Sequence, residues 1–464
     1  MSEPVNRPFQ RFLERYPHPH RPFWERPALS RRQFFEILGT GVTGYALVQL
    51  NRPIRLLAQS TVVPIRKASN CIFILLSGAP SHSDTFDLKE GPWTPASFQP
   101  TSYGDIRFPQ GLMPRLAERL GDLVLVRSVR AWALVHSLAQ TWIQIGRNPA
   151  SALGSIAPHI GSIVAIEKEA ERAPDDLLPG FIALNADGSQ VGAGYLPVAY
   201  APFQVRPSPA GLRNTIHPDG KERWENRLQL LHRLDDPLRK DSPLGPVPTG
   251  LDNFYQAAGR MMYSDRVQSA FTMSADERAA HGTSPFGDAC LVARKILRGR
   301  LGTRFIQITL GGWDHHQNIY APTVLPRMAG QLDAGLGALL DGLREDSLLD
   351  QTLIVVAGEF GRTVGPLTGR GGRDHFLQQS VVFAGAGVHG GKAIGATDAQ
   401  GAATVEAGWS RGRSIKNEDI EATIYSALGI NWTTIRRDDP FNRGFEYVPY
   451  PDSDIYGPIH ELWQ

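Results

Sequence analysis

Five short, mainly apolar runs are spaced along the chain. In most of them apolar and polar residues do not alternate, which is typical of strands buried on both faces. Strands of this kind occur in parallel sheets that helices cover on both sides. The runs occupy residues 70–76, 123–127, 305–310, 352–357 and 380–384.

Helical patterns alternate with these runs. Between residues 328 and 343, Met328, Leu332, Leu336, Leu339 and Leu343 recur every three or four residues, which predicts one apolar helix face. Three further helices are predicted over 112–120, 136–145 and 420–428. Strands that alternate with helices predict an α/β fold with a mostly parallel central sheet and helices on both of its faces.

Residues 160–285 differ from this pattern. They contain Pro- and Gly-rich pieces at 196–209 and 242–250, and a charged helical stretch at 221–233. We interpret this part as an irregular cap inserted within one α/β domain that spans residues 63–464.

Residues 1–62 are read as an export signal and linker. Ser30–Arg32 precedes a weakly apolar segment at 37–50, and paired arginines in this position resemble a twin-arginine signal. The resemblance implies the twin-arginine export machinery as a partner and a periplasmic or extracytoplasmic location, by a cleaved or an anchoring signal. The apolar segment is shorter than the roughly 20 residues of a membrane span, so no stable span is expected. An ordinary amphipathic N-terminal helix is the alternative.

Composition narrows the chemistry. Forty-eight basic residues face 46 acidic ones, for a net charge of +2, which disfavours binding to nucleic acid or to an anionic membrane. The two cysteines, Cys71 and Cys290, form no CxxC pair. Any metal must therefore be held by His, Asp or Glu side chains.

Polar side chains gather where the predicted strands end. The segments 77–87, 133–137, 311–318 and 358–363 follow strands, and 371–376 precedes one. Ligands of open α/β sheets bind outside the carboxyl ends of the strands. A single His in a loop is more often a turn residue, but five such segments together predict one site. They contain five of the thirteen histidines, namely His82, His136, His315, His316 and His375.

The residue types in these loops favour a metal site. Imidazole and carboxylate groups bind zinc and similar divalent ions, and such ions polarise an ester oxygen and acidify a bound water. We expect zinc first, with manganese, calcium or magnesium as alternatives. His315 and His316 point opposite ways on an extended chain, so only one of them is expected to be a ligand. The predicted ligands are Asp84, Asp314, His316, Glu359 and His375.

Arg362 and Arg373 are the candidate anion-binding residues in the same loops. Their guanidinium groups are suited to clamp an anionic substrate through paired hydrogen bonds. A buried ion pair with Glu359 or Asp374 is an equal alternative for both.

Taken together, these segments resemble a large bacterial family known as domain of unknown function 1501. The resemblance runs from the paired arginines to the late helix ending near residue 430. That family is placed in the alkaline phosphatase superfamily, so the resemblance implies an alkaline phosphatase-like fold and a divalent-metal hydrolytic site. The matching motifs are Leu76–Asp87, His136–Ser137 with Gly146–Arg147, Gly311–Asn318, Gly358–Thr363 and Gly372–His375.

Similarity to sulfatases and phosphatases implies residue roles. Counted back from Gly146–Arg147, His136 stands at the sulfatase nucleophile position, where no cysteine is present to form formylglycine. Ser137 is then the candidate nucleophile, and His136 a ligand or base. Glu359–Gly361 stands where phosphatases have Asp-His-Gly, with Phe in place of one ligand. This departure, with the close spacing of Asp314 and His316, puts a two-metal centre in doubt.

The sequence thus indicates an exported, metal-dependent hydrolase-like protein acting on phosphate or sulfate esters, with a small anionic ester or a glycan as substrate. One alternative is a non-catalytic relative that binds a ligand or partner outside the cytoplasm. Another is a structural protein whose polar loops form a salt-bridged core. Convergence of three or more ligand atoms favours a metal site, whereas pairing of all the carboxylates with Arg362 and Arg373 favours the structural alternative.

Overall fold

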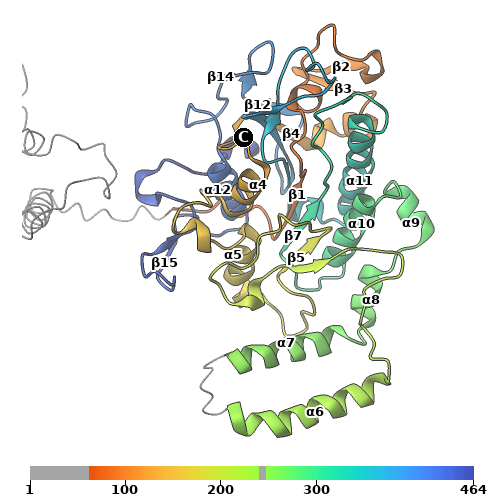
Figure 1. The fold of residues 1–464 in the computed structure, drawn as a ribbon, viewed down its shortest axis with the longest axis vertical. Helices are drawn as coiled ribbons and strands as arrows, with labels where there is room; N and C mark the ends of the chain where they lie inside the picture. The colour runs from red at the N-terminus through yellow and green to blue at the C-terminus, as the bar shows by residue number, and fades with distance from the viewer. Residues whose placement is uncertain (1–61, 240–246) are drawn as a thin grey trace, which may run out of the picture. The chain divides into compact units, whose positions relative to one another are not determined.

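The predicted apolar runs form the middle of one eight-stranded sheet (Figure 1). The computed structural model describes residues 62–239 and 247–464, so the proposed export signal lies outside the described residues. The chain divides into Met1–Val62 and Val63–Gln464. In spatial order the strands are β12 (Lys392–Ile394), β4 (Leu123–Arg130), β11 (Gln378–Gly385), β8 (Thr352–Ala357), β1 (Asn70–Leu75), β7 (Phe305–Thr309), β5 (Phe181–Leu184) and β6 (Phe203–Val205).

Most pairs in this sheet are parallel. β1 pairs in parallel with β7 and β8, β5 with β6 and β7, and β4 with β12. β11 is antiparallel to both of its neighbours, β4 and β8. The predicted α/β fold with a mostly parallel sheet is therefore confirmed.

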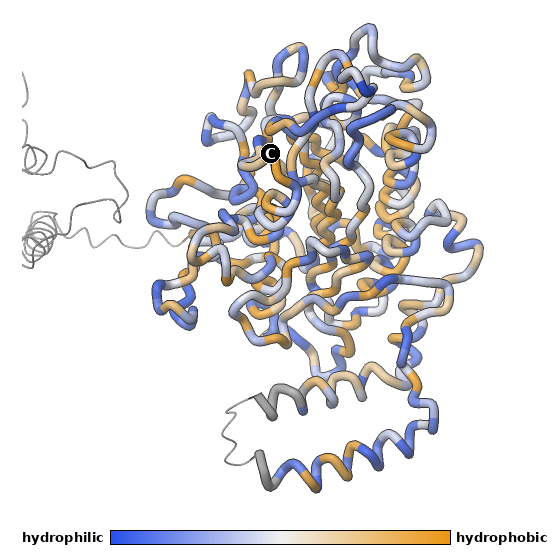
Figure 2. Tube along the Cα trace, in the orientation of Figure 1, coloured by the Kyte–Doolittle hydropathy of each residue, from blue (hydrophilic) through white to orange (hydrophobic). Residues whose placement is uncertain are grey.

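Helices cover both faces of the sheet (Figure 1). α10 (Pro285–Arg298) and α11 (Leu325–Glu345) lie on one face, and α4 (His136–Ile145), α5 (Ile160–Glu167) and α12 (Asn417–Ala427) on the other. All residues of β1, β7 and β8 are buried. Ile72 and Ile74 join the core that contains the leucine stripe of α11, whereas Phe73 stacks on Phe305. Figure 2 shows hydrophobic residues concentrated along these inner strands.

The region 160–285 contributes to the sheet as well as to helices outside it. Besides α5, β5 and β6, it forms α6 (Gly220–Arg239), α7 (Val247–Met261), α8 (Asp265–Phe271) and α9 (Ala275–Ala280). The aromatic ring of Trp224 on α6 lies against Gly259 of α7, so these two helices pack together. The residues predicted to form a cap thus include β5 and the edge strand β6 of the central sheet.

Two further findings concern the helices. The helix predicted over 112–120 is short: α3 covers only Pro114–Ala117, and a 3-10 turn that contains Gly121 follows at Leu120–Asp122. Among the described helices, none combines the length and the apolar character needed to cross a bilayer.

Short two-stranded ladders lie in the loops outside the central sheet. Three of them contain no predicted site residue and pair β2 (Pro100–Tyr103) with β3 (Ile106–Pro109), β13 (Ala396–Thr397) with β14 (Thr404–Glu406), and β15 (Ile435–Arg436) with β16 (Phe445–Glu446). The ladder that matters for the site joins β9 (Gly361–Arg362) to β10 (His375–Phe376), with His375 opposite Arg362.

The sheet order explains why distant segments meet at one rim. β8, β1 and β7 are neighbours and parallel, so the loops after them begin at the same edge. β11 runs the opposite way, so the residues that precede it reach this edge too. β4 ends at the same edge because it is antiparallel to β11, and α4 starts soon after it.

Candidate functional site

Four polar side chains from three segments meet at this rim. His136 lies in the first turn of α4, Asp314 and His316 in the loop after β7, and His375 in β10. One ligand atom from each residue lies within 4.8 Å of those of the others. Hereafter we call His136, Asp314, His316 and His375 the histidine cluster.

The distances within the histidine cluster are short. Asp314 Oδ1 lies 3.0 Å from His316 Nε2, 3.3 Å from His136 Nε2 and 3.8 Å from His375 Nε2. His316 Nε2 is 3.1 Å from His375 Nε2. His136 Nε2 is buried and makes no hydrogen bond with any described residue.

The other ring nitrogen of each histidine, Nδ1, faces an oxygen that only accepts hydrogen bonds. Each Nδ1 therefore donates, and in the neutral ring Nε2 is left with a lone pair. All three lone pairs are then directed into the histidine cluster. The three Nδ1 contacts are 2.7 Å each, from His136 to Glu359 Oε1, from His316 to Asp374 Oδ1, and from His375 to the Leu134 carbonyl oxygen.

Glu359 is the most buried of these partners, with no exposed surface. Its Oε1 accepts from the Gly78 backbone N–H at 2.9 Å and from Gln140 Nε2 at 3.1 Å, besides His136. These bonds tie the loop after β8 to the loop after β1 and to α4. The adjacent Phe360 ring packs against His136 and His375, with centroids 4.7 Å from each.

Arg362 is fully buried and makes five contacts with protein acceptors. Its Nη2 donates to Asp314 Oδ1 at 2.6 Å and to the Gly78 carbonyl. Its Nε donates to the carbonyl of Ala79, and its Nη1 faces the carbonyl of Arg373 and Nε2 of His316. A guanidinium group has five N–H donors. Four of them face protein oxygens and the fifth faces His316 Nε2, so Arg362 has no pair of free donors for a substrate anion.

Arg373 is equally saturated. Its Nε and Nη2 bind the two carboxylate oxygens of Asp84 at 2.6 and 3.0 Å. Nη2 also contacts the Tyr320 hydroxyl, and Nη1 donates to two backbone carbonyls, of Thr363 and Gly365. Both Arg373 and Asp84 are buried. This ion pair therefore links the loop after β1 to the segment before β11.

Charges around the histidine cluster shift its titration. The hydrogen bond to Glu359 raises the pKa of His136 despite burial. Burial lowers the pKa of His375, and the nearby charge of Arg362 lowers it further. Burial opposes ionisation of Asp314, but the hydrogen bond and charge of Arg362 outweigh it and lower the pKa of this carboxyl.

Two glycines permit the close approach of these loops. Gly78 has φ +105°, and a Cβ there would lie 2.7 Å from the Asp314 backbone N. At Gly372, a Cβ would lie 2.0 Å from the carbonyl carbon of His316. Real side chains do not tolerate such contacts with backbone, so both positions require glycine for the rim to form.

The structure places the predicted site residues in three groups. Asp314, His316 and His375 lie in the histidine cluster together with His136, which the sequence assigned to catalysis. Glu359 contacts that cluster through His136. Asp84 lies outside it, in the ion pair with Arg373. His315 is buried beside Trp313 and lies outside the cluster as well.

Ser137 follows His136 in the first turn of α4, and its side chain is exposed. Its backbone carbonyl accepts from Thr141 Oγ1 at 2.8 Å. The hydroxyl is therefore adjacent in sequence to the histidine cluster and accessible to solvent.

Sequence reasoning overlooked Leu134 and Gln140 and weighed Asp374 only as an ion-pair partner. A histidine that binds a metal usually donates its second N–H to a carboxylate or a carbonyl, so an acidic neighbour such as Asp374 beside His375 was a usable signal. The backbone carbonyl of Leu134 carries no such signal in a sequence.

The donor set of the histidine cluster fits a divalent cation. For zinc, bonds of about 2.0–2.1 Å in a tetrahedron separate the ligand atoms by about 3.3 Å, close to most of the distances measured here. Asp314, Glu359 and Asp374 carry three negative charges against the single buried charge of Arg362. Exposed Arg370 lies 3.8 Å from Asp374 and offsets one more of these charges. One negative charge is then still unbalanced.

Comparisons with known proteins identify the chain by family rather than by activity. No curated protein matches it. Solved structures that are similar include a sulfatase from Pseudoalteromonas sp. (12% identity, TM-score 0.36, 87% of this chain and 73% of that one). Others are a phosphonate monoester hydrolase from Silicibacter pomeroyi (13%, 0.34, 78% and 74%) and an alkaline phosphatase superfamily protein from Vibrio parahaemolyticus (11%, 0.33, 79% and 69%).

At TM-scores below 0.5, these similarities assign no reaction or substrate to this chain. The family model described as "Protein of unknown function (DUF1501)" matches residues 68–439, most of the chain. The chain is therefore a member of the DUF1501 family.

Proposed function

We propose that the histidine cluster binds one divalent cation and that the protein is a metal-dependent hydrolase of phosphate or sulfate esters. The observation that carries the proposal is the convergence of three Nε2 atoms and one carboxylate oxygen, with every Nδ1 already bonded. Lone pairs on His316 and His375 that face each other at 3.1 Å repel unless a cation or a proton lies between them. Zinc is the best match for three imidazoles and a carboxylate.

In this proposal His136 is a metal ligand together with Asp314, His316 and His375. Glu359 and Asp374 orient two of the imidazoles and increase their basicity. Asp84 and Arg373 are structural, because each satisfies the other's charge. When bound, a divalent ion supplies a Lewis acid for an ester oxygen and lowers the pKa of a bound water. Ser137 is the candidate nucleophile because its hydroxyl is exposed beside His136.

Metal content of purified variants tests the ligand set. His316→Ala and His375→Ala should lose the bound metal measured by elemental analysis. His389→Ala should keep it, because His389 is exposed and is not part of the histidine cluster. Asp84→Asn should keep the metal in whatever fraction folds. Full metal content in both His316→Ala and His375→Ala contradicts the proposed site.

Turnover is a separate measurement. Phosphate and sulfate monoesters should be hydrolysed by the metal-loaded protein and not after treatment with a chelator. Ser137→Ala should retain metal and lose turnover if its hydroxyl is the nucleophile. Unchanged turnover in this variant assigns the attack to water instead and contradicts this role of Ser137.

The alternative function is a non-catalytic, metal-bound receptor for an anionic ligand or glycan. One observation favours it: nine of the ten N–H groups of Arg362 and Arg373 face protein oxygens and the tenth faces His316 Nε2, so neither arginine offers paired donors to an ester. A metal-loaded protein that hydrolyses none of the esters, yet binds one of them, supports this alternative.

Export by the twin-arginine route is also part of the proposal. It rests on Ser30–Arg32 and the weakly apolar segment after it. Replacing Arg31 and Arg32 by lysine should retain the protein in the cytoplasm when cell fractions are compared with those of the unchanged chain. Equal export of both chains contradicts the proposal.

A further inference from the structure

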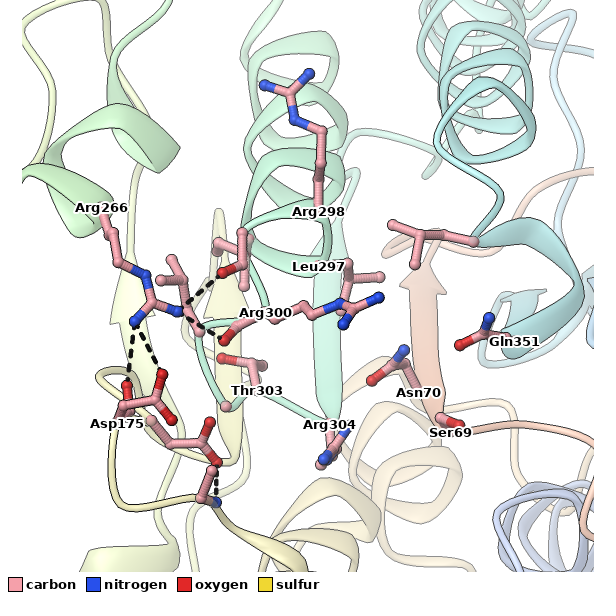
Figure 3. Close-up of a pocket in the computed structure, with 17 residues that line it drawn as sticks. Ser69, Asn70, Asp175, Arg266, Leu297, Arg298, Arg300, Thr303, Arg304 and Gln351 are labelled. Carbon is pink, nitrogen blue, oxygen red and sulfur yellow. Dashed lines mark hydrogen bonds and ion pairs between the residues drawn. The ribbon is translucent and has the colours of Figure 1, made fainter.

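A polar cavity lies at the end of the sheet where β1 and β7 begin, opposite the rim that carries the histidine cluster. Figure 3 shows the residues that line it. It has a volume of about 590 Å³ and is lined where β1 and β7 begin and α10 ends. β1 starts at Asn70 in this cavity and ends next to the histidine cluster. A strand of six residues spans roughly 20 Å, so the two places are separate.

The cavity is rich in hydrogen-bond donors. Figure 3 shows Arg300 extending from the loop after α10 toward Asn70, with Arg304 and Gln351 around the same space. Asn70 is buried, at 7% exposure, and Nε of Arg304 is buried without a hydrogen-bond partner among the described residues. Ser69 adds a hydroxyl at the same wall.

The carboxylates at the cavity are already engaged. Asp175 forms an ion pair with Arg266 at 3.2 Å. Asp176 Oδ2 accepts from the Ala173 backbone N–H at 3.0 Å. Within the described residues, neither Arg300 nor Arg304 has an acidic partner. With four arginines and two aspartates in its lining, the cavity carries a net charge of +2.

We infer that this cavity binds a phosphate or sulfate group, either as the free inorganic anion or as part of a larger molecule. Guanidinium groups present paired N–H donors that match the oxygens of such groups, and the amides of Asn70 and Gln351 add neutral donors. The volume falls in the range of small-molecule sites, about 300–1,000 Å³, and it exceeds the needs of one inorganic anion.

The backbone at Arg300 supports a role for its side chain. Arg300 has φ +47°, in the left-handed region that glycine usually occupies directly after a helix. An arginine at such a position is unfavourable for the backbone, and its guanidinium group forms no hydrogen bond or ion pair with the described residues that would compensate. Arg298 differs: it is the last residue of α10 and points away from Asn70 and Gln351 in Figure 3. Its charge complements the helix dipole.

Thermal unfolding and calorimetric titration test this inference. Inorganic sulfate and phosphate should raise the melting temperature of the full chain relative to chloride at equal ionic strength. Arg300→Gly and Arg304→Gln should each weaken anion binding by roughly tenfold or more, as expected for charged hydrogen bonds. Arg298→Gln is the matched control: it removes a lining charge whose side chain points away from Asn70 and Gln351, so it should weaken anion binding much less than the other two changes. Arg300→Gly should also raise the melting temperature without anion, because glycine relieves the left-handed backbone.

Two further binding measurements identify the source of the anion and distinguish binding in this cavity from binding at the proposed metal site. A sugar phosphate or sulfate that binds more tightly than the inorganic ion indicates an anion carried on a larger molecule, and the reverse order indicates the free ion. His316→Ala in the presence of a chelator should retain the anion response. Absence of any anion response, or an equal response in Arg300→Gly and Arg298→Gln, contradicts the inference.

Discussion

The three histidines of the site are held in three different electrostatic settings. His136 donates to a fully buried carboxylate, His316 to the half-exposed Asp374, and His375 to a neutral carbonyl. A carboxylate that accepts from Nδ1 raises the basicity of an imidazole ligand more than a carbonyl does. The effect is larger when the carboxylate is buried, because water screens its charge less. The individual histidines are therefore expected to contribute unequally to metal affinity.

Replacing Glu359 by glutamine tests this inequality. The amide keeps an oxygen for His136 Nδ1 but removes the charge, so metal affinity should fall by about 10- to 100-fold. Asp374→Asn is the matched change beside His316 and should have a smaller effect, because Asp374 is half exposed. Competition with a chelator of known affinity measures both. An affinity of Glu359→Gln equal to that of the unchanged protein contradicts the assignment.

Glu421 on α12 predicts how stability depends on pH. Burial raises its pKa from 4.5 to about 8, although the charge of Arg147 opposes the shift. Between these pH values the unfolded chain releases this proton before the folded chain does, so the folded state loses stability as the pH rises from 4.5 to 8. The loss attributable to this carboxyl is up to about 4 kcal/mol.

Glu421→Gln removes that titration. Urea unfolding of both proteins at pH 5 and pH 8 should show the free energy of unfolding of the unchanged protein falling relative to that of the variant. The amide retains an oxygen that can accept from the Tyr425 hydroxyl, which binds Glu421 Oε1 at 2.9 Å. Parallel behaviour of the two proteins across this range disagrees with a proton held on Glu421.

Individual site residues could be proposed from the sequence because they follow apolar runs. What the sequence lacks is the direction in which each side chain turns. Asp84 and Asp314 both occur in polar loops after strands, yet Asp84 turns to Arg373 and Asp314 to the histidines. The choice depends on where Arg373 lies, 289 residues from Asp84 in the chain, and the pairing of β9 with β10 sets that position.

At the scale of elements, the site depends on close contact between the loops after β1 and β7. Gly78→Ala should unfold more easily by roughly 2–3 kcal/mol, because its Cβ would meet backbone atoms of Trp313 and Asp314. It should also weaken metal binding by displacing Asp314. Urea unfolding and metal titration measure the two effects.

Gly104→Ala provides the control for this change. Gly104 also has a positive φ, +58°, but an added Cβ there meets nothing within 4 Å. Only the conformational penalty of about 1 kcal/mol should remain, with metal binding unchanged. If both variants lose the same free energy of unfolding and both keep the metal, the close approach at Gly78 contributes neither to stability nor to the metal site.

The elements themselves were predictable to different degrees. The five predicted apolar runs all correspond to strands of the sheet, because a strand buried on both faces is mainly apolar. β5, with only four residues, lies in a region rich in turns, where so short a run does not distinguish a strand from a buried helix segment. β6 is shorter still and only partly buried, so its place at the sheet edge comes from pairing with β5.

For the whole domain, metal binding should appear as added stability. A ligand that binds only the folded state at 100 times its dissociation constant stabilises it by about 2.7 kcal/mol. Zinc should therefore raise the melting temperature by a few degrees, and a chelator should reverse the rise. His316→Ala should not respond to either. An identical response from this variant locates the effect outside the histidine cluster.

The reversal of β11 has a consequence for how this protein can diverge. Because β8 and β11 run in opposite directions, the chain between them, residues 358–377, needs no crossing over a face of the sheet. That single stretch carries Glu359, Arg362, Asp374 and His375 while the strands on either side stay fixed. A relative could therefore gain, lose or exchange most of this chemistry by replacing about twenty consecutive residues, without redesigning the scaffold that supports them.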